Sequence, residues 1–342
     1  MTQKGRPLAA VILAAGKGTR MKSDIPKVLH PLMGKPMVRY ILDTCIKLKA
    51  DRTILVIGHQ ADLVRETLGS ECEYVEQTRQ LGTGHALMTA AKCLKGFSGD
   101  VMVLAGDTPF LTPAILKKLL RKHHTEKAAA TMMTALMDPP LSYGRIVRDD
   151  SGNIQRIVEE RDATPAEKAI TEVNTSHYIF RSETVLPMLS RLHTDNDQGE
   201  YYLTDIIAML AAENETVASV TSDDPGVLMG INHRLHLAEA HQTMKTQILT
   251  EWMLKGVSVP DPGSVYVEPD VRLGEDVTLL PNTMILGKTV VGRGCTIGPQ
   301  VKLQDARIGT DCRIEFSVIE NRKIDNLSRI GPFAYIYHEE VE

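Results

Sequence analysis

Residues 8–27, LAAVILAAGKGTRMKSDIPK, combine an apolar run, a run of small residues and several basic side chains. The apolar run, residues 8–13, predicts a short buried strand of a parallel sheet. The small residues that follow let the backbone turn sharply and bring its N–H groups close to a ligand; they are Ala14, Ala15, Gly16 and Gly18. The same stretch carries four cations, Lys17, Arg20, Lys22 and Lys27. Fixed positive charge around a small-residue turn predicts a site for a polyphosphate.

This loop matches neither of the two common phosphate-binding motifs. A Walker loop requires Gly-x4-Gly-Lys-Ser/Thr, and the dinucleotide fingerprint requires a third glycine where Met21 stands. The longer string L-A-A-G-x-G-T-R-M-x4-P-K, directly after the predicted strand, resembles the signature of sugar-phosphate nucleotidyltransferases. These enzymes transfer a nucleotidyl group from a nucleoside triphosphate to a sugar 1-phosphate. The alternative is a tight strand–loop connection whose basic residues simply face water.

The composition fits a soluble globular chain. Its 342 residues exceed one ordinary domain, so two domains are expected. Hydrophobic residues make up 43% and charged residues 24%, and the net charge of −4 gives no global signal for nucleic acid. No apolar segment approaches the ~18 residues that span a membrane, so no membrane partner is expected.

Cysteine usage and the N-terminus both indicate a cytoplasmic protein. Five scattered cysteines without Cys-x-x-Cys spacing predict free thiols in a reducing compartment. Lys4 and Arg6 before the apolar run 8–15 superficially match a signal peptide. Cleavage there would remove the predicted first strand and cut the loop, so secretion is not expected.

Strands and helices alternate after the loop. Strands are expected at 53–58, 72–75 and 100–105, and helices at 37–48, 61–68, 83–94 and from Pro113. This order predicts an α/β, Rossmann-like domain with a mixed, mainly parallel sheet and helices on both faces. Ligands bind at the carboxyl ends of such strands, so the loop and Gly106-Asp107 are both expected on the binding rim.

The pattern changes between residues 128 and 180. Strands are expected at 128–137, 145–148, 154–159 and 172–180, with a hairpin turn at 149–152. We interpret this part as a sugar-binding lobe of the same domain. Helices are then expected at 202–212 and at 233–255, the second as an arm that joins two domains.

A six-residue repeat begins after the turn at 260–263. Aliphatic residues recur every six positions, with two slips of register, and glycine often follows them. They are Val267, Leu273, Leu279, Ile285, Val291, Ile297, Leu303, Ile308, Ile314, Ile324, Ile330 and Ile336. This period predicts a short left-handed parallel β-helix of about four coils, whereas a β-sandwich would alternate with period two. Similarity to other hexapeptide proteins implies a homotrimer formed through the β-helix.

Further segments, with the loop and the repeat, resemble the N-acetylglucosamine-1-phosphate uridyltransferases, which form the N-terminal half of bifunctional bacterial enzymes. The segments are 77–86 (QTRQLGTGHA), 106–110 (GDTPF), 143–148 (YGRIVR), 157–159 (IVE), 172–175 (EVNT), 196–205 (NDQGEYYLTD) and 230–232 (GIN). The resemblance implies a nucleotidyltransferase domain over 1–232, a linker helix and connection over 233–263, and a hexapeptide-repeat domain over 264–342.

The resemblance implies in-line attack by N-acetylglucosamine 1-phosphate on the α-phosphate of UTP. Such chemistry depends on positioning and charge stabilisation. Arg20 is expected to brace the triphosphate and Lys27 the α-phosphate. Asp107 is expected to bind Mg²⁺, with Asn232 as a second ligand. The alternatives are a helix N-cap for Asp107 and a turn residue for Asn232.

The remaining site residues fall into two groups by resemblance. The nucleotide side is expected to comprise Leu13, Ala14, Ala15, Gly16, Gly18, Gln77, Gly82 and Thr83. The sugar is expected to contact Gly144, Glu159, Asn174 and Thr175. Glu159 could instead be a solvated charge at a strand end. His85 is expected to be structural.

Three departures from the family pattern bear on function. Ala105 stands where a tyrosine is usual, and Ser176 where a glycine is usual. Both put the sugar in question more than the reaction, so a related enzyme with another sugar or base stays an alternative. The basic residue expected shortly after Ala334 is absent, so acetyl transfer is not expected. A non-catalytic scaffold is the third reading.

Overall fold

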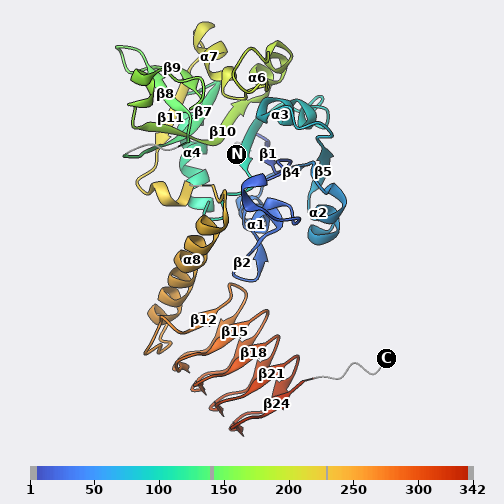
Figure 1. The fold of residues 1–342 in the computed structure, drawn as a ribbon, viewed down its shortest axis with the longest axis vertical. Coiled ribbons are helices and arrows are strands. Elements are labelled where there is room, and N and C mark those ends of the chain that lie inside the picture. The colour runs from blue at the N-terminus through green and yellow to red at the C-terminus, as the bar shows by residue number, and fades with distance from the viewer. Residues whose placement is uncertain (1–5, 139–141, 229, 338–342) are drawn as a thin grey trace, which may run out of the picture. The chain divides into compact units, whose positions relative to one another are not determined.

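We describe the protein from a computed structural model, which covers residues 6–138, 142–228 and 230–337. The chain forms two compact units (Figure 1). The first comprises residues 1–30 and 36–233, and the second comprises 31–35 and 234–342. The sequence did not indicate that residues 31–35, which include strand β2 (Pro31–Leu32), group with the C-terminal part.

One mixed sheet organises the first unit. Its main path runs β11-β7-β10-β6-β1-β4-β5, and the hairpin β8–β9 extends from β10. The strands are β1 (Leu8–Leu13), β4 (Arg52–Ile57), β5 (Glu73–Glu76), β6 (Asp100–Ala105), β7 (Ala130–Leu136), β8 (Arg145–Arg148), β9 (Ile154–Val158), β10 (Glu172–Arg181) and β11 (Val217–Thr221). β1 pairs in parallel with both β4 and β6, while β10 runs antiparallel to β6 and β7. The predicted mixed, mainly parallel Rossmann-like sheet is confirmed.

Helices cover both faces of this sheet. Because successive side chains of a strand point to opposite faces, each central strand contributes to two cores. Ala9 and Val11 of β1 belong to a core shared with α3 and α7, and Ala10 and Ile12 to a core shared with α1, α2 and α4. The helices of this unit are α1 (Met37–Leu48), α2 (Ala61–Leu68), α3 (Thr83–Ala91), α4 (Pro113–Thr125), α5 (Pro165–Lys168), α6 (Ser182–Met188) and α7 (Asp205–Ala212).

Several expected boundaries were wrong. The helix expected at 202–212 begins only at Asp205, and the helix expected at 83–94 ends at Ala91. The sequence did not predict α5, α6 or β11. The start of α7 matters for function, because residues 202–204 are thereby free of the helix and line the site described below.

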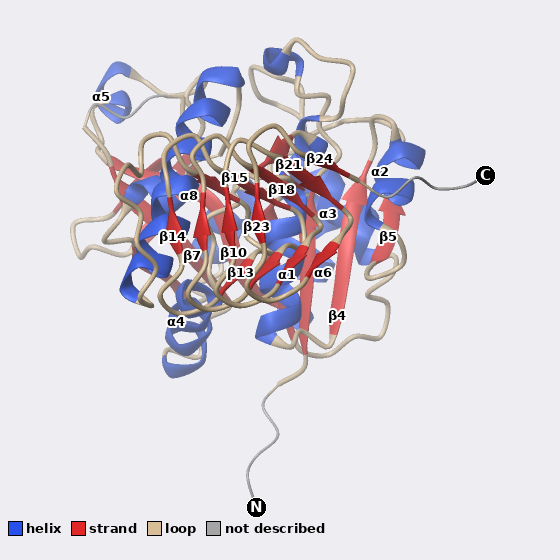
Figure 2. Ribbon diagram, turned by 90° about the horizontal axis from the view of Figure 1, so that it is seen from below, coloured by secondary structure: helices blue, strands red, loops and turns tan. Residues whose placement is uncertain are grey.

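The second unit contains helix α8 (Arg234–Leu254) and a solenoid of short parallel strands (Figure 2). Three sheets run along it, ordered β12-β15-β18-β21-β24, β13-β16-β19-β22 and β14-β17-β20-β23. The strands are β12 (Tyr266–Val267), β13 (Arg272–Leu273), β14 (Thr278–Leu279), β15 (Met284–Leu286), β16 (Val290–Val291), β17 (Thr296–Ile297), β18 (Lys302–Gln304), β19 (Arg307–Ile308), β20 (Arg313–Ile314), β21 (Val318–Glu320), β22 (Lys323–Ile324), β23 (Arg329–Ile330) and β24 (Tyr335–Ile336).

The repeat residues form the core of this solenoid. Ile285, Leu303 and Ile319 stack in register on successive strands of one sheet and are fully buried. The predicted hexapeptide β-helix is therefore confirmed. The expected repeat had omitted Ile319, which takes the inward position of β21. In the part of the chain that the structure describes, no helix combines the length and apolar character needed to cross a membrane.

Candidate active site

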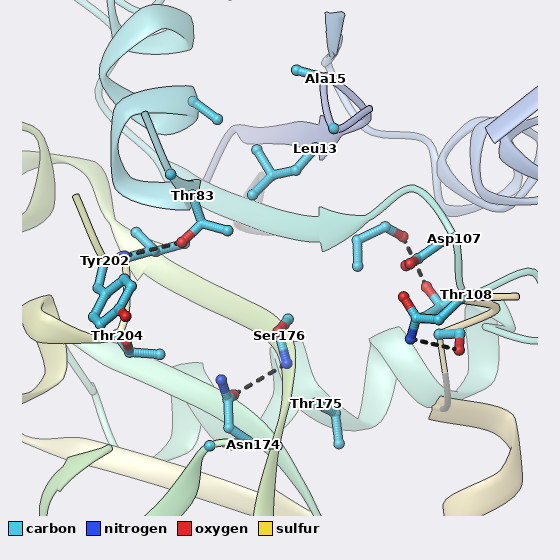
Figure 3. A pocket seen from close by; sticks show the side chains of 18 of the residues that line it. Leu13, Ala15, Thr83, Asp107, Thr108, Asn174, Thr175, Ser176, Tyr202 and Thr204 are labelled. Atoms are coloured by element: carbon cyan, nitrogen blue, oxygen red, sulfur yellow. Dashed lines mark hydrogen bonds between the residues drawn. The ribbon is translucent and has the colours of Figure 1, made fainter. Parts of the chain in front are cut away.

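A cavity of about 470 Å³ opens at the carboxyl ends of β1 and β6 (Figure 3). It gathers segments far apart in sequence, and all but one of the residues expected from the sequence line it. These are Leu13, Ala14, Ala15, Gly16, Arg20, Lys27, Gln77, Gly82, Thr83, Asp107, Gly144, Glu159, Asn174, Thr175 and Asn232. The exception is Gly18, which packs beside Lys27: a Cβ built on Gly18 would lie 2.5 Å from the Lys27 Cβ.

Four polar side chains converge at one end of the cavity. The Lys27 ammonium donates to Asp107 Oδ2 and, over 3.2 Å, to Asn232 Oδ1. Arg20 Nη2 donates to the same Asn232 oxygen over 2.8 Å. The backbone N–H of Ile231 donates to the Asp107 carbonyl over 2.9 Å, which ties the turn after β6 to the 230–232 segment.

Two glycines, Gly230 and Gly106, lie beside this cluster. A Cβ on Gly230 would lie 3.0 Å from Asp107 Oδ2, so a side chain there would crowd the carboxylate. Gly106, at the end of β6, donates its N–H to the Leu13 carbonyl over 3.0 Å. The two strand ends are thus joined directly where the polar side chains meet.

The side of the cavity that is expected to bind the nucleotide is built around the start of α3. Gln77 is buried, and its Nε2 donates to the Gly82 carbonyl over 3.0 Å and lies 2.9 Å from His85 Nδ1. His85 thus supports Gln77, in keeping with its expected structural role. Gly82 has φ +102°, and a Cβ on it would lie 2.6 Å from the Tyr201 carbonyl oxygen, so only glycine fits there. The Thr83 hydroxyl accepts from the Leu203 N–H over 3.1 Å, as Figure 3 shows.

Another wall of the cavity is formed by β10, by the segment that enters β8 and by Glu159, which directly follows β9. Asn174 is buried; its Oδ1 accepts from the Ser176 N–H over 3.1 Å, and its Nδ2 donates to the Tyr178 hydroxyl over 2.7 Å. The Thr175 hydroxyl donates to the Met133 carbonyl over 2.8 Å. The backbone N–H of Asn174 donates to the Gly144 carbonyl over 2.8 Å, which links the hairpin to β10.

Glu159 is a partly buried carboxylate in this wall. Burial raises the pKa of Glu159, the carboxylates of Asp162, Asp205 and Glu200 raise it further, and a hydrogen bond from Thr204 opposes the rise. That bond joins Thr204 Oγ1 to Glu159 Oε1 over 3.0 Å. The alternative of a freely solvated strand-end charge therefore does not describe Glu159 in this structure.

Comparison with known proteins agrees with this architecture. A family model described as nucleotidyl transferase matches residues 9–252, and one described as bacterial transferase hexapeptide (six repeats) matches residues 270–304. The chain belongs to the nucleotidyl transferase family. It is 45% identical to the bifunctional protein GlmU of Halalkalibacterium halodurans over 327 residues, which are 96% of this chain and 72% of that protein. It is 43% identical to the GlmU proteins of Shouchella clausii and Geobacillus thermodenitrificans over the same length.

Nucleotidyl transferases use a divalent metal ion, and the residues at the end of the cavity fit one. The Asp107 carboxylate and the Asn232 amide oxygen both contact one cationic group, the Lys27 ammonium, so they face a common point. Both are hard oxygen donors of the kind that Mg²⁺ takes, with phosphate oxygens and water completing its shell. Among the described residues there is no cluster of three or more His, Cys, Asp or Glu side chains that could hold a metal.

Several residues that line the cavity of this nucleotidyl transferase were not predicted from the sequence. They are Gln80, Thr108, Ser142, Tyr143, Tyr178, Gln198, Glu200, Tyr202, Leu203, Thr204, Leu228 and Gly230, among others. Some of them lie in the segments 143–148 and 196–205, which had carried the resemblance, so a signal existed for them. The helix expected from residue 202 concealed the part played by Tyr202 and Thr204.

Tyr143 is placed close to the polar cluster. Burial and the Asp107 carboxylate raise the pKa of Tyr143, while the Arg20 guanidinium lowers it, so the ring lies within electrostatic reach of both. The buried Arg145 contacts the Tyr143 carbonyl and forms an ion pair of 2.5 Å with Glu160. Arg145 therefore holds the backbone of Tyr143, next to the cavity-lining Gly144.

Proposed function

We propose that this nucleotidyl transferase makes UDP-N-acetylglucosamine and pyrophosphate from UTP and N-acetylglucosamine 1-phosphate, with Mg²⁺ as its metal ion. The observation that carries the proposal is the convergence of Arg20, Lys27, Asp107 and Asn232 at the carboxyl ends of β1 and β6. The 45% identity to a GlmU protein over 96% of the chain supports the choice of reaction.

The phosphoryl step needs charge placement more than covalent chemistry. A phosphate oxygen of the sugar phosphate forms a bond to the α-phosphorus of UTP, and the bond from that phosphorus to the bridging oxygen of pyrophosphate breaks. Lys27 offsets charge on the α-phosphate and Arg20 on the departing pyrophosphate. Asp107 and Asn232 hold the metal ion, which supplies further positive charge to the phosphates when bound.

The nucleotide side recognises uridine in this proposal. Gln77 pairs with the base edge, and Gly82 gives the base room beside Thr83. The nucleotide lies against Leu13, Ala14, Ala15 and Gly16, which line the cavity. Gln77 is already held by Gly82 and His85, so its amide is fixed before the ligand arrives.

The sugar side offers both donors and acceptors. One amide hydrogen of Asn174 bonds Tyr178, which leaves the second for the N-acetyl carbonyl. The Thr175 hydroxyl donates its hydrogen to the Met133 carbonyl, so toward the sugar it can act only as a hydrogen-bond acceptor. Glu159 accepts from sugar hydroxyls, and Gly144 keeps the backbone close to them.

The test is pyrophosphate release across a grid of four nucleoside triphosphates and three sugar phosphates: N-acetylglucosamine, glucosamine and glucose 1-phosphates. We expect turnover confined to UTP with the N-acetylated sugar. Asp107→Asn should reduce kcat by about 10²–10³, since it removes a charged group from the reacting centre. Asp150→Asn, an exposed change on the hairpin turn, is the control. An Asp107→Asn enzyme with full activity would refute the assignment.

A second sugar substrate is the competing proposal, because both unusual residues, Ala105 and Ser176, line the cavity. Turnover with another sugar in the grid would favour it and would keep the mechanism. Silence across the grid, with no rise in Tm on adding Mg²⁺ and UTP together, would favour a non-catalytic scaffold.

Three further statements belong to the same proposal. We propose a homotrimer formed through the β-helix, supported by the hexapeptide match, and sedimentation should then give three times 37.7 kDa. We propose a cytoplasmic location, supported by the free cysteines. The absence of acetyl transfer stays a prediction, because the related proteins are named bifunctional; an assay with acetyl-CoA and glucosamine 1-phosphate tests it.

A further inference from the structure

The oxygen pair proposed to hold the metal ion is already engaged by cationic side chains. Lys27 contacts both oxygens, Asp107 Oδ2 and Asn232 Oδ1. Arg20 adds a second cationic donor to the Asn232 oxygen. An amide oxygen has two lone pairs, so these two donors occupy the full acceptor capacity of Asn232.

A divalent ion and the Lys27 ammonium cannot share this pair. Mg²⁺ binds oxygen at ~2.0–2.1 Å, so an ion on these two oxygens would lie within a few ångströms of the ammonium. At such a separation, a like charge strongly opposes the entry of another. The ion can bind only if the ammonium withdraws from the oxygens.

Lys27 is built so that its ammonium can withdraw while its backbone stays fixed. It opens the 3-10 helix Lys27–Leu29, whose Val28 and Leu29 are buried. A Cβ built on Gly18 would lie 2.5, 3.3 and 3.4 Å from the Cβ, Cγ and Cδ of Lys27, so the base of the lysine side chain lies close to the Gly18 backbone. Beyond these atoms a lysine side chain retains rotatable bonds, so its charge can move by several ångströms.

We propose that Lys27 and the divalent ion are alternative occupants of the Asp107–Asn232 oxygen pair, and that an incoming triphosphate exchanges them by drawing the ammonium onto a phosphate. The proposal rests on the proposed function for the identity of the metal pair and of the nucleotide. Its consequence is an order of binding: the free protein holds the ion weakly, and the ion enters with or after the triphosphate.

The experiment measures Mn²⁺ binding by electron paramagnetic resonance, with and without UTP, for the parent chain, Lys27→Met and Lys17→Met. Without UTP, Lys27→Met should bind Mn²⁺ at least about tenfold more tightly than the parent, since one neighbouring charge shifts ionic equilibria by one or more logarithmic units. Lys17 is an exposed cation of the same loop that does not line the cavity. Its replacement controls for the general loss of charge and should change the affinity by less than about twofold.

The same measurements are repeated with UTP. UTP should tighten Mn²⁺ binding to the parent, and the difference in Mn²⁺ affinity between the parent and Lys27→Met should largely disappear. Adding Asp107→Asn to Lys27→Met should abolish the gain, which assigns it to this oxygen pair. Lys27→Gln repeats the measurement with a polar side chain, and the far-ultraviolet circular dichroism of each variant checks its fold.

The outcomes separate this proposal from the proposed function. Equal or weaker Mn²⁺ binding by folded Lys27→Met or Lys27→Gln, compared with the parent, overturns the exchange. Binding to none of the proteins, even with UTP, overturns both the exchange and the metal pair. Intact exchange without pyrophosphate release in the substrate grid would instead contradict only the proposed reaction.

Discussion

Ser176, which lines the cavity, has an unfavourable backbone conformation. Its φ is +61°, a left-handed conformation that costs an L-residue roughly 1–2 kcal/mol. It lies at the irregularity between Asn174 and Tyr178, where the pairing of β10 with β7 shifts register. The N–H of Ser176 holds the Asn174 amide oxygen, so this conformation also fixes the orientation of a proposed sugar contact.

We therefore expect Ser176→Gly to stabilise the protein. Glycine adopts positive φ freely but loses more entropy on folding, so the net gain should be a few tenths to about 1 kcal/mol. Urea unfolding measures it. Ser176→Ala is the matched control, because alanine also disfavours this conformation and should give no gain. Equal stabilisation by both variants would mean that the hydroxyl, rather than the backbone, is unfavourable.

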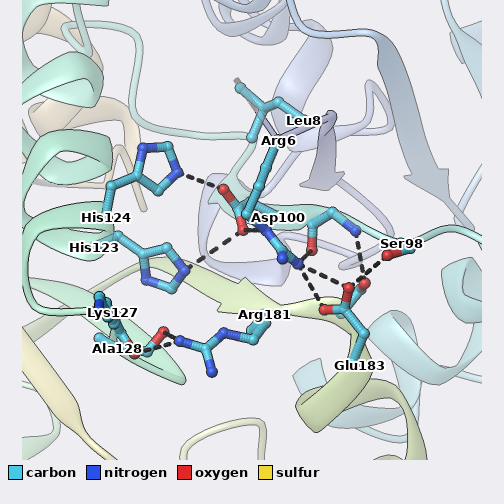
Figure 4. A network of polar contacts seen from close by, with 12 residues as sticks. Arg6, Leu8, Ser98, Asp100, His123, His124, Lys127, Ala128, Arg181 and Glu183 are labelled. Carbon is cyan, nitrogen blue, oxygen red and sulfur yellow. Dashed lines mark hydrogen bonds and ion pairs between the residues drawn. The ribbon is translucent and has the colours of Figure 1, made fainter. Parts of the chain in front are cut away.

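Asp100 is the first residue of β6, at the end of the strand opposite to the cavity, and Figure 4 shows it among Arg6, His123 and His124. It is almost fully buried and contacts Arg6 over 3.0 Å and His124 over 2.6 Å, with His123 at 3.7 Å. Burial would raise the pKa of Asp100, but the hydrogen bonds and charges of His123 and His124 outweigh it and lower that pKa from 3.8 to about 2.

This lowered pKa predicts a loss of stability in acid. The unfolded chain takes up the proton first, so the contribution of Asp100 is complete above about pH 4 and falls as the pH drops toward 2. Its size is on the order of 2 kcal/mol. Urea unfolding between pH 5 and pH 2.5 should show a shallower pH dependence for Asp100→Asn than for the parent. Asp150→Asn should keep the parental slope, and an unchanged slope in Asp100→Asn would contradict the assignment.

At the scale of elements, the loop after β1 uses its glycines for different reasons. Gly18 has φ +61°, and a Cβ there would overlap Lys27, whereas a Cβ on Gly16 would meet no atom within 4 Å. Gly18 is therefore a packing requirement of the loop. Gly16 leaves open space in the cavity, where the proposed nucleotide would lie.

Gly18→Ala should accordingly destabilise the first unit by about 1–2 kcal/mol or more, since it adds strain and a clash. Gly16→Ala should leave the free energy of unfolding within about 0.5 kcal/mol of the parent. Chemical denaturation of both variants measures the difference. Gly18→Ala should also slow pyrophosphate release, because it displaces Lys27. Equal stability of the two variants would show that the loop adjusts without cost.

At the scale of the whole molecule, the second unit has its own core and its own optical probe. Trp252 of α8, the one tryptophan of the chain, packs against the solenoid core, and the Lys255 ammonium lies 4.9 Å from its ring centre. Tryptophan fluorescence therefore reports on this unit.

Ile297→Ala should destabilise the solenoid by about 2–5 kcal/mol, because Ile297 is fully buried and its truncation removes apolar contacts from the core. The fluorescence transition of Trp252 should move to lower denaturant concentration. Met284→Ala, at a 43% exposed outward position on β15, is the control and should stay within about 0.5 kcal/mol of the parent. Equal shifts for the two variants would contradict the inward and outward alternation.

The architecture of both units follows from patterns in the sequence, because those patterns are local. An apolar run followed by small residues predicts a strand and a turn, and a six-residue period is satisfied only by a coil that repeats at that spacing. The same local strings identified about half of the residues that line the cavity. The residues missed include those in 142–143, 178 and 198–204, where a wrong helix boundary or an unassigned motif concealed several of them.

The contacts between segments far apart in the sequence become apparent only in the folded protein. Lys27 and Asn232 are separated by 205 positions, and their contact depends on the pairing of β1 with β6 and on the bond from Ile231 to Asp107. The left-handed Ser176 and the position of Gly18 beneath Lys27 likewise follow from packing between elements. Such contacts are set by the summed packing of the sheet and its helices, which no local pattern encodes.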